Sequence, residues 1–240
     1  MAATWARNER KLMRDPQMLE AVRNGIESVA RDLGRGALES EALAERLGAL
    51  TERNAELDRI ERGQVPRLEL YRAVAETIRT HDLPLQPFRD LLDAFIQDVT
   101  KQRYASFADV MDYCRRSANP VGRLLLHLQD ERAPDSLACS DRICTSLQLI
   151  NFLQDVAIDH AKGRIYLPQD EMARFDVDEA CIARGDASGP WHAFMEFQIE
   201  RTRRMLMDGA PLGRVLKGLS LIHISEPTRL RRISYAVFCL

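Results

Sequence analysis

Residues 148–168 read QLINFLQDVAIDHAKGRIYLP, and this stretch determines the fold class and the chemistry expected of the chain. Four polar residues recur in it at intervals of three and four positions: Gln148, Asn151, Asp155 and Asp159. At about 100° per residue of α-helix, they share a sector of roughly 80°. Apolar residues fill the positions between them, and a polar stripe on so apolar a helix must face water or a ligand.

The two aspartates of the stripe have the spacing of a magnesium site. Mg²⁺ typically binds one or two carboxylates together with water and the phosphate oxygens of a substrate. We therefore expect Asp155 and Asp159 to bind Mg²⁺, and Gln148 and Asn151 to contact the substrate or metal-bound water. The alternative is a solvated helix face, because aspartates four residues apart are common on protein surfaces.

The residues that follow the stripe favour a phosphate ligand. Gly163 is free to turn the chain at the end of the helix. Arg164 and Tyr166 then lie directly beyond the C-terminal end of that helix. A guanidinium makes forked contacts with phosphate oxygens, so Arg164 is a candidate substrate-binding residue. The alternative is a cation favoured by the dipole at a helix C-terminus.

Helical periodicity extends over most of the chain, with Gly and Pro between the periodic segments. Ser106 is a candidate N-cap for the helix that contains Phe107 and Val110. The expected helices cover residues 17–33, 38–62, 67–79, 85–99, 106–129, 136–160, 191–207 and 211–222. Together they predict an all-α fold, a helical bundle around a central cavity or core.

The composition excludes several other classes of protein. The 34 basic and 36 acidic residues leave a net charge of −2, which gives no field that attracts nucleic acid. Five cysteines without a CxxC pair argue against a disulfide framework or a zinc site and favour a reducing compartment. No stretch reaches the roughly 20 apolar residues of a membrane span. We expect a cytoplasmic protein that binds no nucleic acid and can still rest against a membrane.

Two segments resemble the squalene and phytoene synthase family. Residues 148–168 resemble its second aspartate-rich motif, and DVTKQRYASFADVMDYCRRSANPVGRLLLHL (98–128) resembles its mid-chain signature. Within these segments, YCRRSANPVGRLLLHL and NFLQDVAID are most similar to the hydroxysqualene synthases of the hopanoid pathway. The resemblance covers approximately residues 40–218.

This resemblance implies an isoprenoid-synthase fold, Mg²⁺, and presqualene or farnesyl diphosphate as substrate. In the hydroxysqualene branch, presqualene diphosphate ionises, its cyclopropyl cation rearranges, and water captures the product cation without a reductant. The resemblance also implies two catalytic residues, Asp98 facing the cavity and Tyr113 handling the cationic intermediate. From the residues alone, a surface aspartate and a core tyrosine are the alternatives.

Both ends of the sequence depart from the pattern of that family. The first aspartate-rich motif, FARxADDxxD, has no counterpart in residues 1–39, and residues 219–240 contain one acidic residue and no clear helical period. We therefore expect an atypical segment over 1–39, a synthase-like domain over 40–218 and a non-native tail over 219–240. Because one carboxylate helix holds roughly half of a multi-ion cluster, we expect weak activity or none.

Other functions are compatible with the same residues. Within the family, phytoene synthase and presqualene diphosphate synthase are the alternatives, and analysis of the product separates them. A Mg²⁺-dependent all-α diphosphohydrolase would release phosphate without forming a hydrocarbon. A non-catalytic helical interaction protein would use the aspartate stripe as a solvated face, and it would bind no diphosphate.

Overall fold

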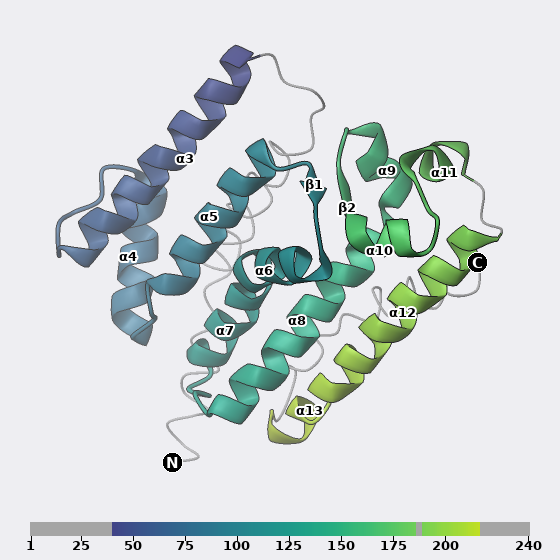
Figure 1. Cartoon of the computed structure of the whole chain (residues 1–240). Coiled ribbons are helices and arrows are strands. Elements are labelled where there is room, and N and C mark those ends of the chain that lie inside the picture. Colours follow the sequence, from purple (N-terminus) through teal and green to yellow (C-terminus); the bar gives the residue numbers. More distant parts are fainter. Residues whose placement is uncertain (1–39, 186–188, 217–240) are drawn as a thin grey trace.

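The computed structural model describes residues 40–185 and 189–216, which form a bundle of α-helices with one pair of short strands (Figure 1). The helices are α3 (Ser40–Glu61), α4 (Glu69–His81), α5 (Gln86–Thr100), α6 (Phe107–Ser117), α7 (Asn119–Leu128), α8 (Pro134–Gln154), α9 (Val156–Ala161), α10 (Gln169–Arg174), α11 (Glu179–Arg184), α12 (Pro190–Gly209) and α13 (Leu212–Val215). The strands β1 (Arg103–Tyr104) and β2 (Ile165–Pro168) pair in parallel. The all-α prediction is confirmed for these residues.

Most of the expected helices are present with slightly different ends. The segments expected over 38–62, 67–79, 85–99 and 191–207 correspond to α3, α4, α5 and α12. The first half of the segment expected over 211–222 contains α13, and its second half lies outside the described residues. The helix expected over 17–33, the atypical segment and the non-native tail also lie outside them. The short helices α10 and α11 were not predicted, because six residues are too few to show a period.

Two expected helices are each interrupted. The segment expected over 106–129 forms α6 and α7, which meet at Ala118. Pro120 in the first turn of α7 lacks the N–H that would continue α6, so the chain starts a new helix there. The segment expected over 136–160 also divides, and its break at Asp155 bears directly on the site. The predicted N-cap is confirmed, since the Ser106 hydroxyl accepts the Asp109 N–H at 3.3 Å.

Helix α8 is the central element, with α7 packed on one side of it and α12 along another (Figure 1). Between α5, α6, α8 and the strands lies a core that contains Tyr104, Tyr113, Leu149 and Phe152. The N-terminal helices α3, α4 and α5 share a second core around Leu57. No helix in the described part of the chain is long and apolar enough to cross a membrane.

Close packing of α8 against α12 depends on a glycine. A Cβ at Gly209 would lie 2.8 Å from the Cys139 carbonyl oxygen and 2.7 Å from Cγ1 of Ile143. The backbone oxygen cannot move away without shifting α8. The two helices therefore approach each other at a distance that only glycine permits at this position.

We predict that Gly209→Ala lowers the free energy of unfolding by about 1–3 kcal/mol, because overpacking forces the two helices apart. Gly48→Ala is the matched control, since Gly48 lies within α3 with nothing within 4 Å of an added Cβ. This control should be stabilising by about 0.5–1 kcal/mol, the usual gain in helix propensity. Urea unfolding measures both changes, and equal effects of the two substitutions would contradict the packing account.

Candidate functional site

A buried carboxylate lies at the centre of the candidate site. Asp98, on α5, is 7% exposed. The hydroxyl of Tyr113, on α6, donates a hydrogen bond to Asp98 Oδ2 at 2.8 Å, and that of Tyr166, on β2, donates to Oδ1 at 3.4 Å. Burial raises the pKa of Asp98 to about 6, although these hydrogen bonds and the charge of Arg164 favour the ionised form. Asp98 is therefore not the surface aspartate considered as its alternative.

Aromatic rings enclose the two tyrosines that bond to Asp98. Tyr166 stacks on Phe152 of α8, with ring centroids 4.0 Å apart and an interplanar angle of 4°. The Tyr113 ring lies 5.6–5.9 Å from the rings of Tyr104, Phe152 and Tyr166. Burial, followed by the charge of Asp98, raises the pKa of both Tyr113 and Tyr166. Both hydroxyls therefore stay protonated and available as donors.

Arg164 lies next to this cluster. Its charge lowers the pKa of Asp98, Asp159 and Tyr166, so the guanidinium lies close to all three side chains. The predicted turn is confirmed, since Gly163 has a φ of 75° and the Arg164 N–H bonds to the Asp159 carbonyl oxygen at 2.8 Å. Tyr166 and Arg164 thus connect the buried Asp98 with the end of the aspartate stripe.

The stripe itself does not lie on one continuous helix, and this part of the prediction is wrong. Helix α8 ends at Gln154, and Asp155 has φ −100° and ψ 15°, outside the α region. Aspartate is a weak helix former, which favours a break here. Backbone bonds from Asp155 N–H to the Asn151 carbonyl oxygen (2.9 Å) and from Asp159 N–H to that of Asp155 (2.8 Å) still span the break. The two aspartates therefore remain one turn apart.

The stripe residues differ in exposure. Asp155 is exposed, whereas Asp159, Gln148 and Asn151 are half-buried. The pKa of Asp159 is raised first by burial and then by the negative charge of Asp155. Gln148 and Asn151 lie one turn apart on α8, and Asn151 is joined to Asp155 through the backbone. A cation between the carboxylates would relieve the repulsion that raises the pKa of Asp159.

The oxygen atoms of the stripe residues fit a hard cation that also binds water and substrate oxygens. Among residues 40–185 and 189–216, no group of three or more His, Cys, Asp or Glu side chains lies close enough to hold a metal by itself. Two carboxylates with neighbouring amide oxygens are instead the partial set of oxygen ligands that Mg²⁺ uses when substrate phosphates and water complete its shell. The residues present are therefore compatible with Mg²⁺ bound together with a diphosphate.

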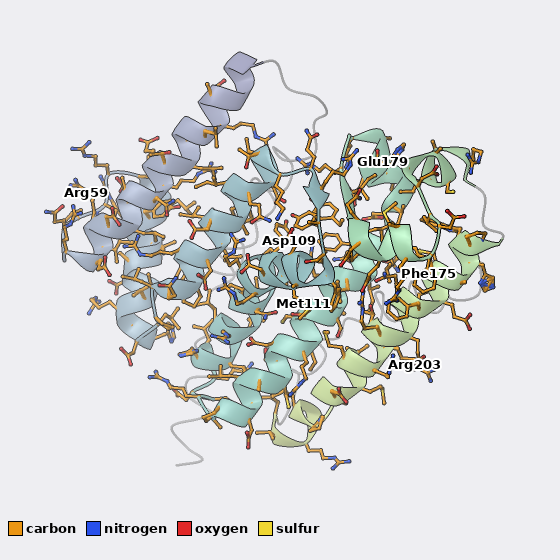
Figure 2. The ribbon with its side chains drawn as sticks, viewed as in Figure 1. Arg59, Asp109, Met111, Phe175, Glu179 and Arg203 are labelled. Carbon is orange, nitrogen blue, oxygen red and sulfur yellow. The ribbon has the colours of Figure 1, made fainter. Side chains whose placement is uncertain are left out.

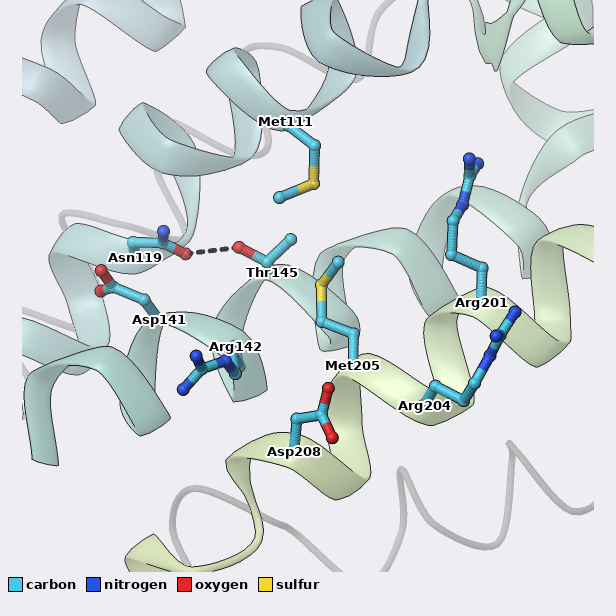
Figure 3. A pocket seen from close by; sticks show the side chains of 9 residues that line it. All are labelled: Met111, Asn119, Asp141, Arg142, Thr145, Arg201, Arg204, Met205 and Asp208. Atoms are coloured by element: carbon cyan, nitrogen blue, oxygen red, sulfur yellow. Dashed lines mark hydrogen bonds between the residues drawn. The ribbon is translucent and has the colours of Figure 1, made fainter. Parts of the chain in front are cut away.

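A larger pocket lies beside an earlier part of α8, where that helix meets α6, α7 and α12. It has a volume of about 550 Å³ and is lined by Met111, Asn119, Asp141, Arg142, Thr145, Arg201, Arg204, Met205 and Asp208 (Figure 3). In Figure 3, Thr145 of α8 donates to the Asn119 side chain at 2.8 Å, with Met111 above this pair and Met205 beside it. None of the sequence-predicted site residues lines this pocket. A space of about 10 Å³ lies beside Phe152 and Tyr166.

Sequence reasoning missed how central Tyr166 is. It was noted only as a neighbour of Arg164, yet its hydroxyl contacts Asp98, which is 68 positions away in the chain. Gln97 was also missed; it donates to the Tyr104 hydroxyl at 3.3 Å and accepts a bond from Arg116. One signal in the sequence pointed to these contacts. Each of the two short segments KQRYAS and GRIYLP, which follow helices with polar ends, contains a single tyrosine, Tyr104 or Tyr166.

Solved structures share most of this arrangement of helices. The squalene synthase HpnC from Alicyclobacillus acidocaldarius superposes with a TM-score of 0.78 and 29% identity, over 92% of this chain and 81% of that one. A dehydrosqualene synthase superposes with a TM-score of 0.73 and 21% identity, over 94% and 83% of the two chains, and supports the fold alone. The bundle therefore has the all-α isoprenoid-synthase fold.

Sequence comparison assigns the family. The family model "Squalene/phytoene synthase" matches residues 18–229, and the chain belongs to that family. It is 36% identical over 143 residues to the 15-cis-phytoene synthase of Synechococcus elongatus, covering 55% of this chain and 46% of that protein. It is 34% identical over 148 residues to the chloroplastic phytoene synthase of Daucus carota, covering 59% and 37%. The chain thus spans less than half the length of these relatives.

We predict that the contribution of Asp98 to the free energy of unfolding falls as pH rises. A carboxylate stabilised by an ion pair has the opposite pH dependence. The pKa of Asp98 is raised from 3.8 to about 6 in the folded chain, so its contribution is fully present below pH 3.8 and is lost as pH rises through about 6. Asp98→Asn removes this loss. Relative to the unchanged chain, the free energy of unfolding of the variant should rise by about 2 kcal/mol between pH 4 and pH 7.5.

Denaturant unfolding at the two pH values measures this difference. Asp93→Asn, at an exposed position of the same helix, is the matched control. A gain for Asp98→Asn that is no larger than the gain for Asp93→Asn would contradict the burial account.

Proposed function

We propose that this chain acts on a prenyl diphosphate with the help of Mg²⁺, and that it converts presqualene diphosphate to hydroxysqualene. The observation that carries the proposal is the junction of the buried Asp98–Tyr113–Tyr166 cluster with Arg164 and Asp159. It puts a guanidinium and a carboxylate suited to a metal-bound diphosphate beside a carboxylate whose pKa is near neutral. The preference for this product rests on the SANPVG and NFLQDVAID segments and on the likeness to the squalene synthase HpnC.

The anionic end of the substrate is assigned to the stripe. Asp155 and Asp159 would hold Mg²⁺, which supplies positive charge that stabilises the departing diphosphate. Arg164 would bind diphosphate oxygens directly, and Gln148 and Asn151 would contact the diphosphate or metal-bound water. Since the charge of Arg164 also acts on Tyr166, the same guanidinium would hold the diphosphate next to the aromatic cluster.

The carbocation end is assigned to Asp98 and Tyr113. When the C–O bond breaks, its electron pair leaves with the diphosphate and a carbocation remains. Water adds to the rearranged cation and then loses a proton, so presqualene diphosphate and water give hydroxysqualene and hydrogen diphosphate. With a pKa of about 6, Asp98 can accept that proton near neutral pH. Tyr113 orients the accepting carboxylate through its 2.8 Å hydrogen bond.

A second candidate, phytoene or presqualene diphosphate synthase, is favoured by the phytoene synthases among the relatives. These reactions join two prenyl diphosphates, whereas the proposed one consumes presqualene diphosphate and water. The peripheral contact with a membrane also stays a proposal, motivated by the lipid nature of the product.

We predict that the purified chain, given Mg²⁺ and presqualene diphosphate, forms hydroxysqualene that mass spectrometry detects. Farnesyl and geranylgeranyl diphosphate are tested in parallel, and long incubations allow for the slow turnover expected without a FARxADDxxD segment. Formation of phytoene or presqualene diphosphate would favour the second candidate. Release of phosphate without any hydrocarbon product would favour a diphosphohydrolase.

We also predict that the double change Asp155→Asn and Asp159→Asn removes Mg²⁺-dependent binding of inorganic diphosphate, because no carboxylate of the stripe remains for the metal. Isothermal titration calorimetry measures this binding without requiring turnover. Asp135→Asn with Asp141→Asn, a pair on α8 outside the stripe, is the control. If the stripe variant binds as tightly as the unchanged chain, the metal-site assignment is wrong.

A further inference from the structure

The turn that carries Arg164 is held by a residue from the other strand. Arg103, on β1, donates from Nη1 to the Gly163 carbonyl oxygen at 2.6 Å and to the Gln102 carbonyl oxygen at 3.0 Å. The same guanidinium makes a two-pronged ion pair with Glu179 at the start of α11, with Nε–Oε1 and Nη2–Oε2 distances of 2.7 and 2.9 Å. Figure 2 shows Glu179 between the β2 region and α11.

The backbone around Arg103 reinforces this contact. Arg103 is paired in register with Ile165, and the Ile165 N–H donates to the Gln102 carbonyl oxygen at 3.0 Å. The turn is therefore fixed at Gly163 by the side chain and at Ile165 by the strand pair. Arg164 lies between these two fixed points, so its backbone position follows from theirs.

The chemistry of this contact requires arginine. A lysine ammonium could reach one carboxylate oxygen or one carbonyl, but it lacks the planar fork that bonds to both oxygens of Glu179 and to the turn together. Arg103 and Glu179 are 35% and 47% exposed, and ion pairs so exposed contribute little to global stability. The contact therefore acts mainly on local geometry, because the Arg103 guanidinium joins β1, α11 and the Gly163 turn.

We infer that Arg103, with Glu179, is a positioning residue that holds the Gly163 turn so that Arg164 can bind a diphosphate. This inference rests on the proposed function for its ligand. The contacts of Arg103 with the Gly163 carbonyl oxygen and with Glu179, called the Arg103 clamp below, rest on the structure alone. Arg103 does not touch the substrate in this assignment. It acts through Arg164, which predicts that its effect on binding disappears when the Arg164 side chain is removed.

A double-mutant cycle tests this dependence. Inorganic diphosphate with Mg²⁺ is titrated into the unchanged chain, Arg103→Lys, Arg164→Ala and the double variant, and the Kd is measured by calorimetry. We expect Arg103→Lys to raise the Kd about fivefold in the unchanged chain and less than about twofold in the Arg164→Ala background. Glu179→Gln should act in the same direction as Arg103→Lys. Equal effects in the two backgrounds would overturn the positioning role.

Hydrogen exchange provides a readout that does not depend on any ligand. Arg103→Lys should speed exchange of the backbone amides in residues 162–166, because the turn loses its anchor. Arg89→Lys is the control, since Arg89 bridges Asp58 and Glu61 at 2.8 Å each between α5 and α3, away from the turn. Unchanged exchange in residues 162–166 of Arg103→Lys would overturn the clamp. Absence of diphosphate binding by the unchanged chain would instead overturn the proposed function. Hydrogen exchange in residues 162–166 would still show whether Arg103 holds the Gly163 turn.

Discussion

Burial of the Asp98 carboxylate is the constraint on which the rest of the site depends. An ionised carboxylate in the core loses its hydration, and the chain compensates with donors from two distant segments, Tyr113 on α6 and Tyr166 on β2. Since Tyr166 lies in β2, two residues after Arg164, the bond to Asp98 also holds the strand that follows the aspartate stripe. The polar centre therefore helps to determine where Arg164 and Asp159 lie, the residues proposed to bind the diphosphate and its metal.

The family and the fold are established more firmly than the reaction. The family model and the superposition on HpnC define a member of the squalene/phytoene synthase family with an isoprenoid-synthase bundle. Members of this family act on prenyl diphosphates, and the comparisons leave the product of this chain to the proposal. In the proposed reaction, Asp98 would take a proton from the water that attacks the cation, because its pKa is raised to about 6.

Local signals in the sequence predicted local structure well. The Ser106 cap, the turn at Gly163 and the helices expected over 38–62, 67–79, 85–99 and 191–207 depend on neighbours within a few residues, and these are present. The break at Asp155 was not predictable, because the apolar period continues through it. Contacts such as Tyr166 with Asp98, or Arg103 with Gly163, join residues 60 or more positions apart, and no pattern in a single sequence records them. The sequence thus indicated candidate site residues but not the network that connects them.

The central claim is that Asp98 is a buried carboxylate held by two tyrosine hydroxyls, and an NMR titration of its carboxyl carbon tests it most directly. Selective ¹³C labelling of aspartate, with Asp98→Asn to assign the signal, gives the pKa in the folded chain. The account predicts a pKa of about 6, which rises further in Tyr113→Phe because the ionised form loses its shorter hydrogen bond. A midpoint near 3.8, unchanged in Tyr113→Phe, would contradict the account.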